Sequence, residues 1–312
     1  MSDVVRPAPL RLGATLAVVS PASTPKAELV QRGMMRLQEL GYRTVLGSHA
    51  LASGPLYYAG TLEQRLSDLH AAFADPSVDG IVCTRGGWGS AELLPHLDAA
   101  LIRANPKAFI GYSDQSSLHT WLQNEANLGC FYGPMVAADF GRDDGVDLAS
   151  WLHCFEGDRG WSLGASDGLR VLRGGSAEGV LRGGCLSILA EALGTPYAPE
   201  TSGSVLFLED IGTKPYKWDR LLVHLKYSGR LDGVSGIVFG DMAQCVDPEE
   251  YEYLERALMH ALRDFDGPIA IGLRCGHVKG PNVTLPLGVR VRLDLTDSRN
   301  PHMTFSEAAV AV

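Results

Sequence analysis

The segment FIGYSDQSS (residues 109–117) marks the point at which an apolar strand gives way to a polar turn and a helix. A serine or aspartate at such a point often caps the helix that follows. A serine on a sharp strand-to-helix turn is also where hydrolases hold a nucleophile. Ser113 therefore has two interpretations, a helix cap and a catalytic nucleophile, and this segment by itself favours the cap.

Outward from this segment, strands and helices alternate through the first half of the chain. Apolar residues at helical spacing predict helices over residues 26–40 and 62–73. Buried strands are expected at ATLAVVS, YRTVLG, GIVCT and KAFIG, which are residues 14–20, 42–47, 80–84 and 107–111. Such alternation is typical of a parallel sheet in a doubly wound α/β domain.

The second half of the chain has a different pattern. Helices are expected over residues 218–227 and 248–263, between short strands at SVLFLED, GIVFGD, PIAIG and VRVRLDL (204–210, 236–241, 268–272 and 289–295). This pattern indicates a smaller C-terminal α+β domain. Gly and Asp are frequent between residues 140 and 175. We therefore predict an N-terminal domain over residues 1–155, a linker over 156–175 and a C-terminal domain over 176–312.

Composition excludes several classes of protein. Hydrophobic residues make up 46% and charged residues 20% of the 312, an ordinary balance for a globular protein. A net charge of −9 argues against a nucleic-acid partner, which requires a basic surface. No apolar segment is long enough to cross a membrane, and the N-terminus does not read as a secretory signal. The six cysteines are scattered without zinc spacing, so we expect reduced thiols in a cytoplasmic protein.

Two loops are expected at the same edge of the parallel sheet, because both follow the carboxyl ends of strands. One is YSDQSS with Ser113, and the other is RGGWGS (residues 85–90). The first matches only half of G-x-S-x-G, since Gln115 stands at the second glycine position. The backbone N–H of Asp114 and the glycine-rich loop are candidate donors to an oxyanion. The alternative for the loop is a plain glycine-rich connection.

A serine nucleophile also needs a base and a carboxylate that orients it. Most of the nine histidines lie in predicted helices or other structural positions, but His277 lies in the loop RCGHVKGPN (residues 274–282). It is either a solvated side chain or the base. Glu209 and Asp210 end an apolar strand, where they are either surface groups or the source of the orienting carboxylate.

Together these motifs resemble the LD-carboxypeptidases, a serine peptidase family that includes the microcin-immunity enzymes. The resemblance rests on RGGWGS, PKAFIGYSD, GPM, LRGG-LS, LFLED…PYKWDR and GHVKGPNVTLPLG, in that order, and runs over nearly the whole chain. It implies that Ser113 is the nucleophile, Glu209 the acid and His277 the base. It also implies an oxyanion hole formed by the N–H groups of Gly87 and Asp114.

The resemblance carries further expectations. It implies an amidotransferase-like N-terminal domain, a homodimer, and hydrolysis without a metal or other cofactor. The expected substrate is a small peptide, the cytoplasmic murein tetrapeptide, from which D-alanine would be released during peptidoglycan recycling. The residues expected to contact this substrate are Arg85, Gly86, Trp88, Cys185 and Trp218.

Three of these points stay open in the sequence. Arg85 either binds the substrate carboxylate or forms a structural ion pair. The family often has asparagine at the position of Cys185 and an aliphatic residue at that of Trp218. These differences bear on which substrate binds and not on the triad. The substrate is either the murein peptide or an acylated nucleotide toxin, as for a microcin-immunity enzyme. An alternative of another class is a catalytically silent small-ligand binding protein.

Overall fold

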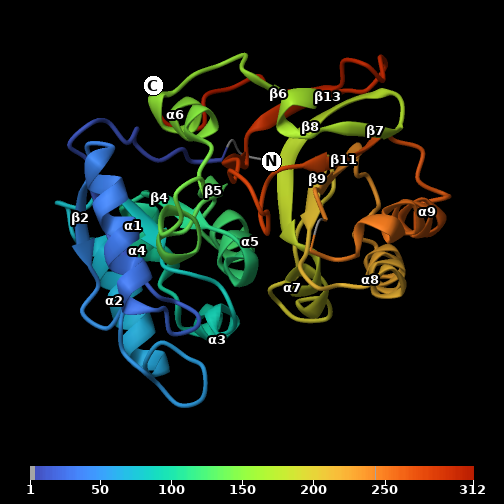
Figure 1. The fold of residues 1–312 in the computed structure, drawn as a ribbon. Helices are drawn as coiled ribbons and strands as arrows, with labels where there is room; N and C mark the ends of the chain where they lie inside the picture. Colours follow the sequence, from blue (N-terminus) through green and yellow to red (C-terminus); the bar gives the residue numbers. More distant parts are fainter. Residues whose placement is uncertain (1–3, 243) are drawn as a thin grey trace. The chain divides into compact units, whose positions relative to one another are not determined.

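The chain divides into two structural units. The structure, a computed structural model, describes residues 4–242 and 244–312. Unit 1 takes in the chain up to Asp158 together with Gly280–Pro286 and Ala308–Val312. Unit 2 comprises Arg159–Lys279 and Leu287–Glu307. Figure 1 labels the elements of both units.

A six-stranded sheet forms the centre of unit 1, in the order β12-β5-β4-β3-β1-β2. The neighbouring strands from β2 to β5 all pair in parallel. Strands β1, β3, β4 and β5 are buried along their whole length, as expected for a sheet covered on both faces. The strands are β1 (Thr15–Val19), β2 (Arg43–Leu46), β3 (Gly80–Cys83), β4 (Ala108–Gly111), β5 (Cys130–Tyr132) and β12 (Leu285–Leu287).

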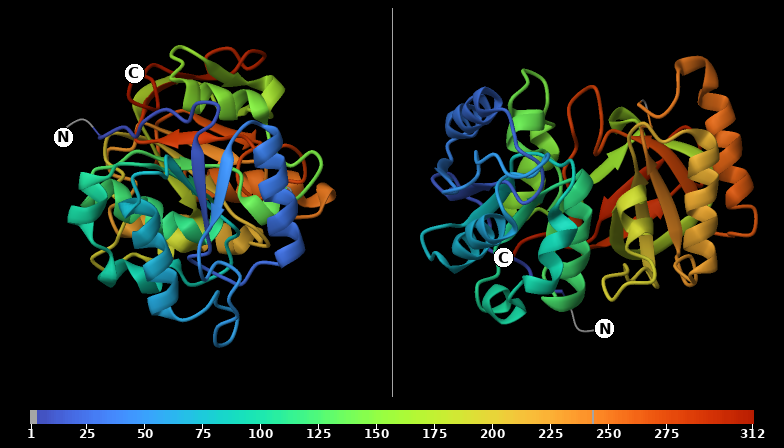
Figure 2. Two further views of the ribbon diagram at one scale, coloured as in Figure 1. Left: turned by 90° about the vertical axis from the view of Figure 1, so that its left-hand side faces the viewer. Right: turned by 90° about the horizontal axis from the view of Figure 1, so that it is seen from below.

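Helices connect these strands and lie on both faces of the sheet (Figure 2). Helix α1 packs against the π-helical turn η3, whereas α2 packs against α4. The helical elements of unit 1 are α1 (Ala27–Glu39), α2 (Leu62–Ala74), α3 (Ser90–Leu93), η1 (Leu94–His96), α4 (Ala99–Ala104), η2 (Ser113–Gln115), α5 (Ser116–Glu125), η3 (Val136–Phe140) and α6 (Leu148–Glu156). The predicted doubly wound domain is confirmed.

Local sequence explains where the helices begin. Thr61 and Gln64 form a capping box at the start of α2, because each side chain bonds the other's backbone N–H, at 3.3 and 2.9 Å. The Asp98 side chain accepts bonds from the N–H groups of Ala100 and Leu101 in the first turn of α4. These caps fix the helices that follow β2 and β3, and so fix the connections of the sheet.

The order of the strands creates a switch point. The chain passes from β1 outward to β2 and then returns to β3 on the other side of β1. In parallel sheets of this kind, ligands bind at the carboxyl ends of the strands next to such a point. The loops after β1, β3 and β4 therefore share the edge at which a site is expected.

Unit 2 is built on a mixed eight-stranded sheet, in the order β6-β14-β13-β8-β9-β10-β11-β7. Strands β8 to β11 pair in parallel, and the outer strands pair antiparallel. The strands are β6 (Ser162–Gly164), β7 (Arg170–Arg173), β8 (Ser176–Cys185), β9 (Ser204–Glu209), β10 (Gly236–Gly240), β11 (Ile269–Leu273), β13 (Arg290–Asp294) and β14 (His302–Phe305). The predicted smaller domain with its own sheet is confirmed.

The helices of unit 2 bury one apolar core against this sheet. Leu222 and Leu225 of α8 and Leu254 and Leu258 of α9 are completely buried in it. Truncating one such leucine costs about 2–5 kcal/mol of stability. The helical elements are η4 (Ala165–Asp167), α7 (Leu186–Glu191), α8 (Pro215–Tyr227), η5 (Pro248–Glu250) and α9 (Tyr251–Ala261).

The segment expected to be a linker is structured. Residues 156–175 contain β6 and β7, which pair with β14 and β11 in the sheet of unit 2. Its glycines and aspartates form the turns between these short strands, as at Gly168 with φ +93°. The Gly- and Asp-rich composition therefore reflects tight turns.

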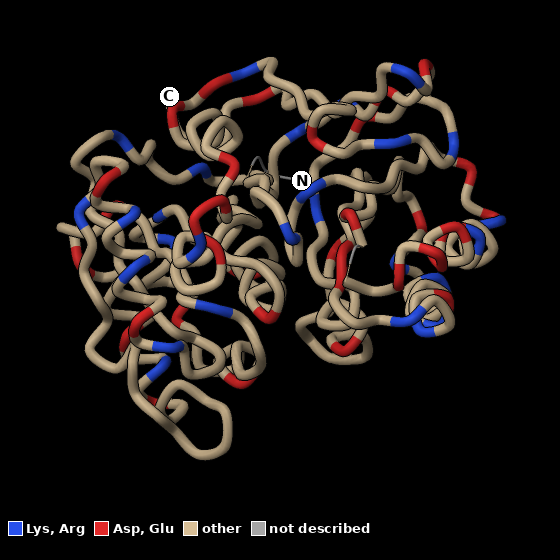
Figure 3. The backbone as a smooth tube through the Cα atoms, in the orientation of Figure 1, with Lys and Arg blue, Asp and Glu red and all other residues tan. Residues whose placement is uncertain are grey.

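The cysteines, the charged residues and the helix lengths bear on the expectations from composition. All six cysteines are buried with free thiols. Basic and acidic residues are interspersed along both units (Figure 3). Within residues 4–242 and 244–312, no helix has the length and apolar character needed to span a bilayer.

A buried histidine makes acid stability testable. His119 of α5 is 0% exposed, lies between the rings of Phe109 and Tyr132, and has no hydrogen-bond partner for either ring nitrogen among the described residues. Burial lowers its pKa to about 3 from 6.5. Below pH 6.5 the unfolded chain therefore binds a proton that the folded chain excludes, and stability falls as the pH falls toward 3.

We expect His119→Phe to weaken this acid dependence, by about 1.4 kcal/mol for each pH unit over which only the unfolded state is protonated. The measurement is urea unfolding at about pH 7.5 and about pH 5. Replacing the exposed His96 by Phe is the control. An equal loss of stability on acidification in wild type and His119→Phe would contradict the explanation.

Candidate active site

Ser113 occupies a strained turn at the carboxyl end of β4. Its φ of +67° lies in the left-handed region, which costs a residue other than glycine roughly 1–3 kcal/mol. Neither η2 nor α5 has a side-chain cap bond at its N-terminus. A helix cap has extended backbone and bonds a following N–H, so Ser113 does not act as one. The geometry is that of a nucleophile elbow.

The glycine-rich loop after β3 lies against this turn. A Cβ added to Gly86 would come within 2.8 Å of both Cβ and Oγ of Ser113, and within 3.4 Å of the Asp114 backbone N. Gly87 has φ +112°, and a Cβ there would be 2.3 Å from Oγ of Ser23. Neither position has room for a side chain, because Ser113 and Ser23 lie too close. A plain glycine-rich connection would not need such close contacts.

Three side chains fix this arrangement. Gln115 donates from Nε2 to the Arg85 carbonyl at 3.1 Å, which joins the elbow to the glycine-rich loop. The Ser113 N–H donates to the Tyr132 hydroxyl at 3.1 Å, and the Trp88 N–H donates to Ser23 Oγ at 3.1 Å. Because Ser113 N–H is occupied by Tyr132, it is not available as an oxyanion donor.

Asp114 is a structural carboxylate. Its side chain is completely buried, and Oδ2 accepts from the Ser90 N–H at 2.8 Å, at the start of α3. Burial raises the pKa of this carboxyl, although hydrogen bonds from Ser90 and Gly89 act to lower it. Asp114 thus ties the elbow to α3, while its backbone N–H lies beside Gly86.

Glu209 and His277 form a pair in unit 2. Glu209 ends β9 and is 2% exposed. Its Oε2 accepts from both Nδ1 and the backbone N–H of His277, at 2.8 and 3.0 Å. Because a carboxylate only accepts, His277 carries its proton on Nδ1 and offers Nε2 as a base.

Glycines shape this pair as they shape the elbow. A Cβ on Gly276, which has φ +92°, would lie 2.4 Å from the Glu209 carboxyl carbon, and a Cβ on Gly240 would lie 2.7 Å from the Glu209 Cβ. Asp210 bonds instead to the Ser187 N–H at 2.9 Å and to the Ile211 N–H at 2.8 Å. Of the two strand-end acids, Glu209 is therefore the one that orients His277.

The predicted substrate-binding residues differ in exposure. Arg85 is exposed and has no ion pair among the described residues, so the structural ion-pair interpretation lacks support. Trp88 is half-buried. Cys185 is 3% exposed opposite Glu209 in the β8–β9 ladder, and burial raises its pKa well above the usual value. Trp218 is 0% exposed and packs edge-on against Phe239, which gives it a role in the core.

Two family models match most of this chain. Residues 16–133 match the LD-carboxypeptidase N-terminal domain, and residues 178–293 match the LD-carboxypeptidase C-terminal domain. The chain belongs to the LD-carboxypeptidase family. It is therefore a serine peptidase, as the resemblance of its motifs implied.

Individual relatives of this LD-carboxypeptidase cover almost its whole length. A probable murein peptide carboxypeptidase of Bacillus subtilis is 36% identical, over 94% of this chain and 92% of the relative. The microcin C7 self-immunity protein MccF of Escherichia coli is 30% identical, over 95% of each chain. The crystal structure of a muramoyltetrapeptide carboxypeptidase from Oxalobacter formigenes has a TM-score of 0.81 and 28% identity, over 95% of this chain and 99% of that one.

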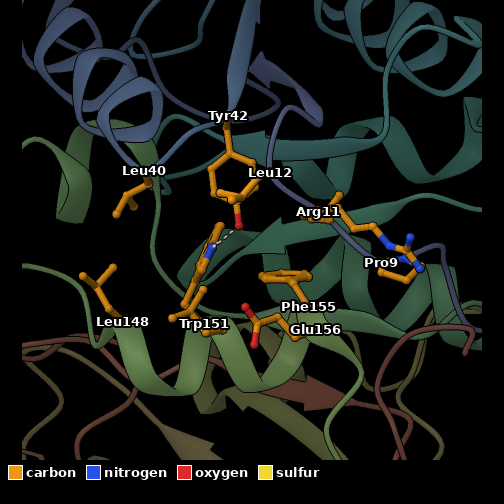
Figure 4. A pocket seen from close by; sticks show the side chains of 11 residues that line it. Pro9, Arg11, Leu12, Leu40, Tyr42, Leu148, Trp151, Phe155 and Glu156 are labelled. Carbon is orange, nitrogen blue, oxygen red and sulfur yellow. Dashed lines mark hydrogen bonds between the residues drawn. The ribbon is translucent and has the colours of Figure 1, made fainter.

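A separate groove of about 290 Å³ lies in unit 1 of this LD-carboxypeptidase (Figure 4). It is lined by Trp151 and Phe155 of α6, by Tyr42, and by residues 9–12. Tyr42 and residues 9–12 precede β2 and β1, at the amino ends of the strands. The groove therefore lies at the opposite edge of the sheet from Ser113 and contains none of the predicted site residues.

Sequence reasoning missed Tyr132, Ser23 and the bonding role of Gln115. Gln115 offered a signal, because it replaces the second glycine of the nucleophile motif. Tyr132 and Ser23 come from other strand ends, and only the packing of the sheet brings them to the elbow.

Gly86→Ala should lower the carboxypeptidase kcat by at least about 100-fold, because the added Cβ displaces the loop or Ser113, and losing one oxyanion donor has a cost of that order. The measurement is steady-state kinetics, accompanied by thermal unfolding to compare the stability of the variant with that of wild type. The control is Gly174→Ala, where the added Cβ comes no closer than 3.3 Å to a neighbour, the Leu295 carbonyl oxygen. A fully active Gly86→Ala enzyme would show that close approach of the loop is unnecessary.

Proposed function

We propose that this LD-carboxypeptidase removes the terminal D-alanine from cytoplasmic murein tetrapeptides, by cleaving the amide between the L-centre of meso-diaminopimelate and D-alanine. The observation that carries the proposal is the left-handed turn at Ser113 beside the glycine-rich loop. The relatives named as murein peptide and muramoyltetrapeptide carboxypeptidases support the substrate.

The proposed chemistry is acyl transfer through a triad of Ser113, Glu209 and His277. His277 Nε2 takes the proton of the Ser113 hydroxyl as Oγ bonds to the scissile carbonyl carbon. Glu209 holds the imidazole tautomer and stabilises the imidazolium that forms. The N–H groups of Gly87 and Asp114 would bind the oxyanion of the tetrahedral intermediate.

The intermediate then collapses. The carbon–nitrogen bond breaks as the leaving amine of D-alanine takes the proton from His277. A water molecule next gives a proton to His277 and attacks the acyl-enzyme. Finally the carbon–Oγ bond breaks and Ser113 recovers its proton, which regenerates the enzyme.

The same proposal includes the setting of the reaction. We infer that the enzyme acts as a homodimer in the cytoplasm, within peptidoglycan recycling, because the resemblance of its motifs implies this. Of the two predicted domains, the N-terminal one supplies Ser113, and the C-terminal one supplies Glu209 and His277.

The decisive test is D-alanine release from L-Ala-D-Glu-meso-diaminopimelate-D-Ala. Wild type should release D-alanine, and Ser113→Ala should lower kcat at least about 1000-fold, since loss of a triad serine costs that or more. Ser117→Ala, about one helical turn further along, is the matched control. Release that is unaffected by Ser113→Ala would overturn the serine mechanism.

A second prediction concerns the free carboxylate of the substrate. Arg85 is exposed next to Gly86 and has no ion pair among the described residues. We expect Arg85→Ala to raise KM about 10–100-fold with little change in kcat, because a hydrogen bond between charged groups contributes about 1.5–3 kcal/mol. A tetrapeptide with a C-terminal amide is the matched control. If Arg85→Ala raises KM by the same factor for the tetrapeptide with a free carboxylate and for its amide, Arg85 does not bind the carboxylate.

The second candidate function is hydrolysis of acylated nucleotide toxins, such as aminoacyl-sulfamoyl or phosphoramidate nucleotides. The 30% identity to the E. coli microcin C7 self-immunity protein over 95% of the chain favours it. Turnover of such an amide without D-alanine release would select this candidate. Absence of turnover with either substrate, with retained ligand binding, would indicate a silent binding protein.

A further inference from the structure

A buried arginine of unit 1 contacts the glycine-rich loop, and the mechanism above does not use it. Arg65 lies in the first turn of α2 and is only 3% exposed. Its guanidinium donates hydrogen bonds to three groups that all belong to unit 1. Arginine is rarely buried to this degree unless it is paired, so its partners indicate which parts of the structure it holds.

Two of these bonds join loops that follow different strands. Arg65 Nη1 donates to the Gly89 carbonyl at 2.7 Å, in the loop after β3, and to the Pro21 carbonyl at 3.1 Å, in the loop after β1. Gly89 has φ +135°, and a Cβ there would lie 2.6 Å from Arg65 Nη1, so only glycine leaves room for the contact. One guanidinium nitrogen therefore holds both loops.

The same two loops meet at Gly87. Ser23 belongs to the loop after β1, and its Oγ accepts from the Trp88 N–H at 3.1 Å. A Cβ on Gly87 would be 2.3 Å from that oxygen. The position of the Gly87 backbone thus depends on the two loops that Arg65 joins, and the Gly87 N–H is one of the proposed oxyanion donors.

The charge of Arg65 is balanced by acidic groups. Its Nη2 donates to Oε2 of Glu92 in α3 at 2.6 Å. Burial raises the pKa of the Asp114 carboxyl, and the charge of Arg65 is among the groups that act to lower it. Arg65 Cζ also lies 4.8 Å from the centroid of the Tyr58 ring. A buried charge is tolerated when it is paired and hydrogen-bonded in this way, so these contacts fix the guanidinium that holds the loops.

We propose that Arg65 is a positioning residue for the oxyanion hole, because it joins the loops after β1 and β3 and so fixes the Gly87 N–H. This inference rests on the proposed function, since that N–H affects the rate only if it binds the oxyanion. Arg65 is buried and does not touch the substrate in this account. It acts through the loop, by keeping the donor in place before the negative charge develops.

The test is D-alanine release by Arg65→Met, which removes the donors and keeps an unbranched side chain. We expect kcat to fall about 10–100-fold with KM nearly unchanged, because a displaced donor weakens the transition state and hardly affects the bound substrate. Active enzyme is counted by complete titration of Ser113 with a fluorophosphonate. Loss of folded protein therefore does not count as loss of kcat.

A second measurement separates positioning from stability. A non-covalent phosphonate analogue of the substrate should lose affinity for Arg65→Met by the same factor as kcat/KM falls, because its anionic oxygen uses the same N–H donors. A residue that only stabilises the fold would lower the unfolding temperature and leave this affinity unchanged for each titrated site.

Lys107→Met is the matched control. Lys107 is also a buried cation of unit 1, and its Nζ donates to two backbone carbonyls, those of Ala72, at 2.9 Å, and Asp75. It directly precedes β4, so it lies at the opposite end of that strand from Ser113. We expect Lys107→Met to lower the unfolding temperature and to leave kcat and phosphonate affinity at the wild-type values.

A second variant keeps the inference testable if Arg65→Met does not fold. Arg65→Lys retains the positive charge beside Glu92 and Asp114, but a single ammonium lacks the planar fork that reaches Glu92 and both carbonyls. We expect kcat to fall at least about threefold, again with KM nearly unchanged.

The outcomes separate the two proposals. If Ser113→Ala is fully active, the proposed mechanism fails. If Ser113→Ala is inactive but the Arg65 variants that fold keep the wild-type kcat for each titrated site, the inference is overturned and the mechanism stands. A loss confined to KM, or an equal loss of kcat in Lys107→Met, would overturn the inference in the same way.

Discussion

The left-handed backbone of Ser113 is the constraint that joins the carboxyl ends of β3, β4 and β5. A serine at φ +67° persists only when its surroundings determine the conformation, and here the Tyr132 hydroxyl, Gln115 and the loop at Gly86 do so. The same contacts bring the glycine-rich loop beside the serine hydroxyl. The strain of the turn and the placement of the candidate oxyanion donors therefore have one structural cause.

Unit 2 meets a matching requirement for His277, the proposed base. A buried carboxylate is tolerated only when it is paired and hydrogen-bonded. Glu209 satisfies this condition through two bonds to His277, and the absence of a Cβ at Gly276 makes room for them. The pair is thereby assembled before any substrate arrives, so no free energy of binding is needed to orient the imidazole.

Sequence reasoning recovered the parallel sheet because the buried strands of unit 1 are short apolar runs bounded by turn residues. It missed β8, because the glycines of this strand hide the strand pattern. Gly183 is needed there, since a Cβ on it would come 1.9 Å from the Phe207 carbonyl oxygen of β9. The motifs indicated Glu209 and His277, but only packing could separate Glu209 from Asp210. Likewise, the burial of Trp218 follows from its long-range contacts, which no local pattern contains.

We propose that Ser113, His277 and Glu209 act as one catalytic site. A crystal structure with a phosphonate analogue of the diaminopimelyl-D-alanine amide tests it most directly. We expect phosphorus bound to or directly beside Ser113 Oγ, with His277 Nε2 within about 3 Å of that oxygen. The anionic oxygen should accept from the N–H groups of Gly87 and Asp114. An analogue bound away from Ser113, or His277 beyond hydrogen-bond reach of its hydroxyl, would contradict it.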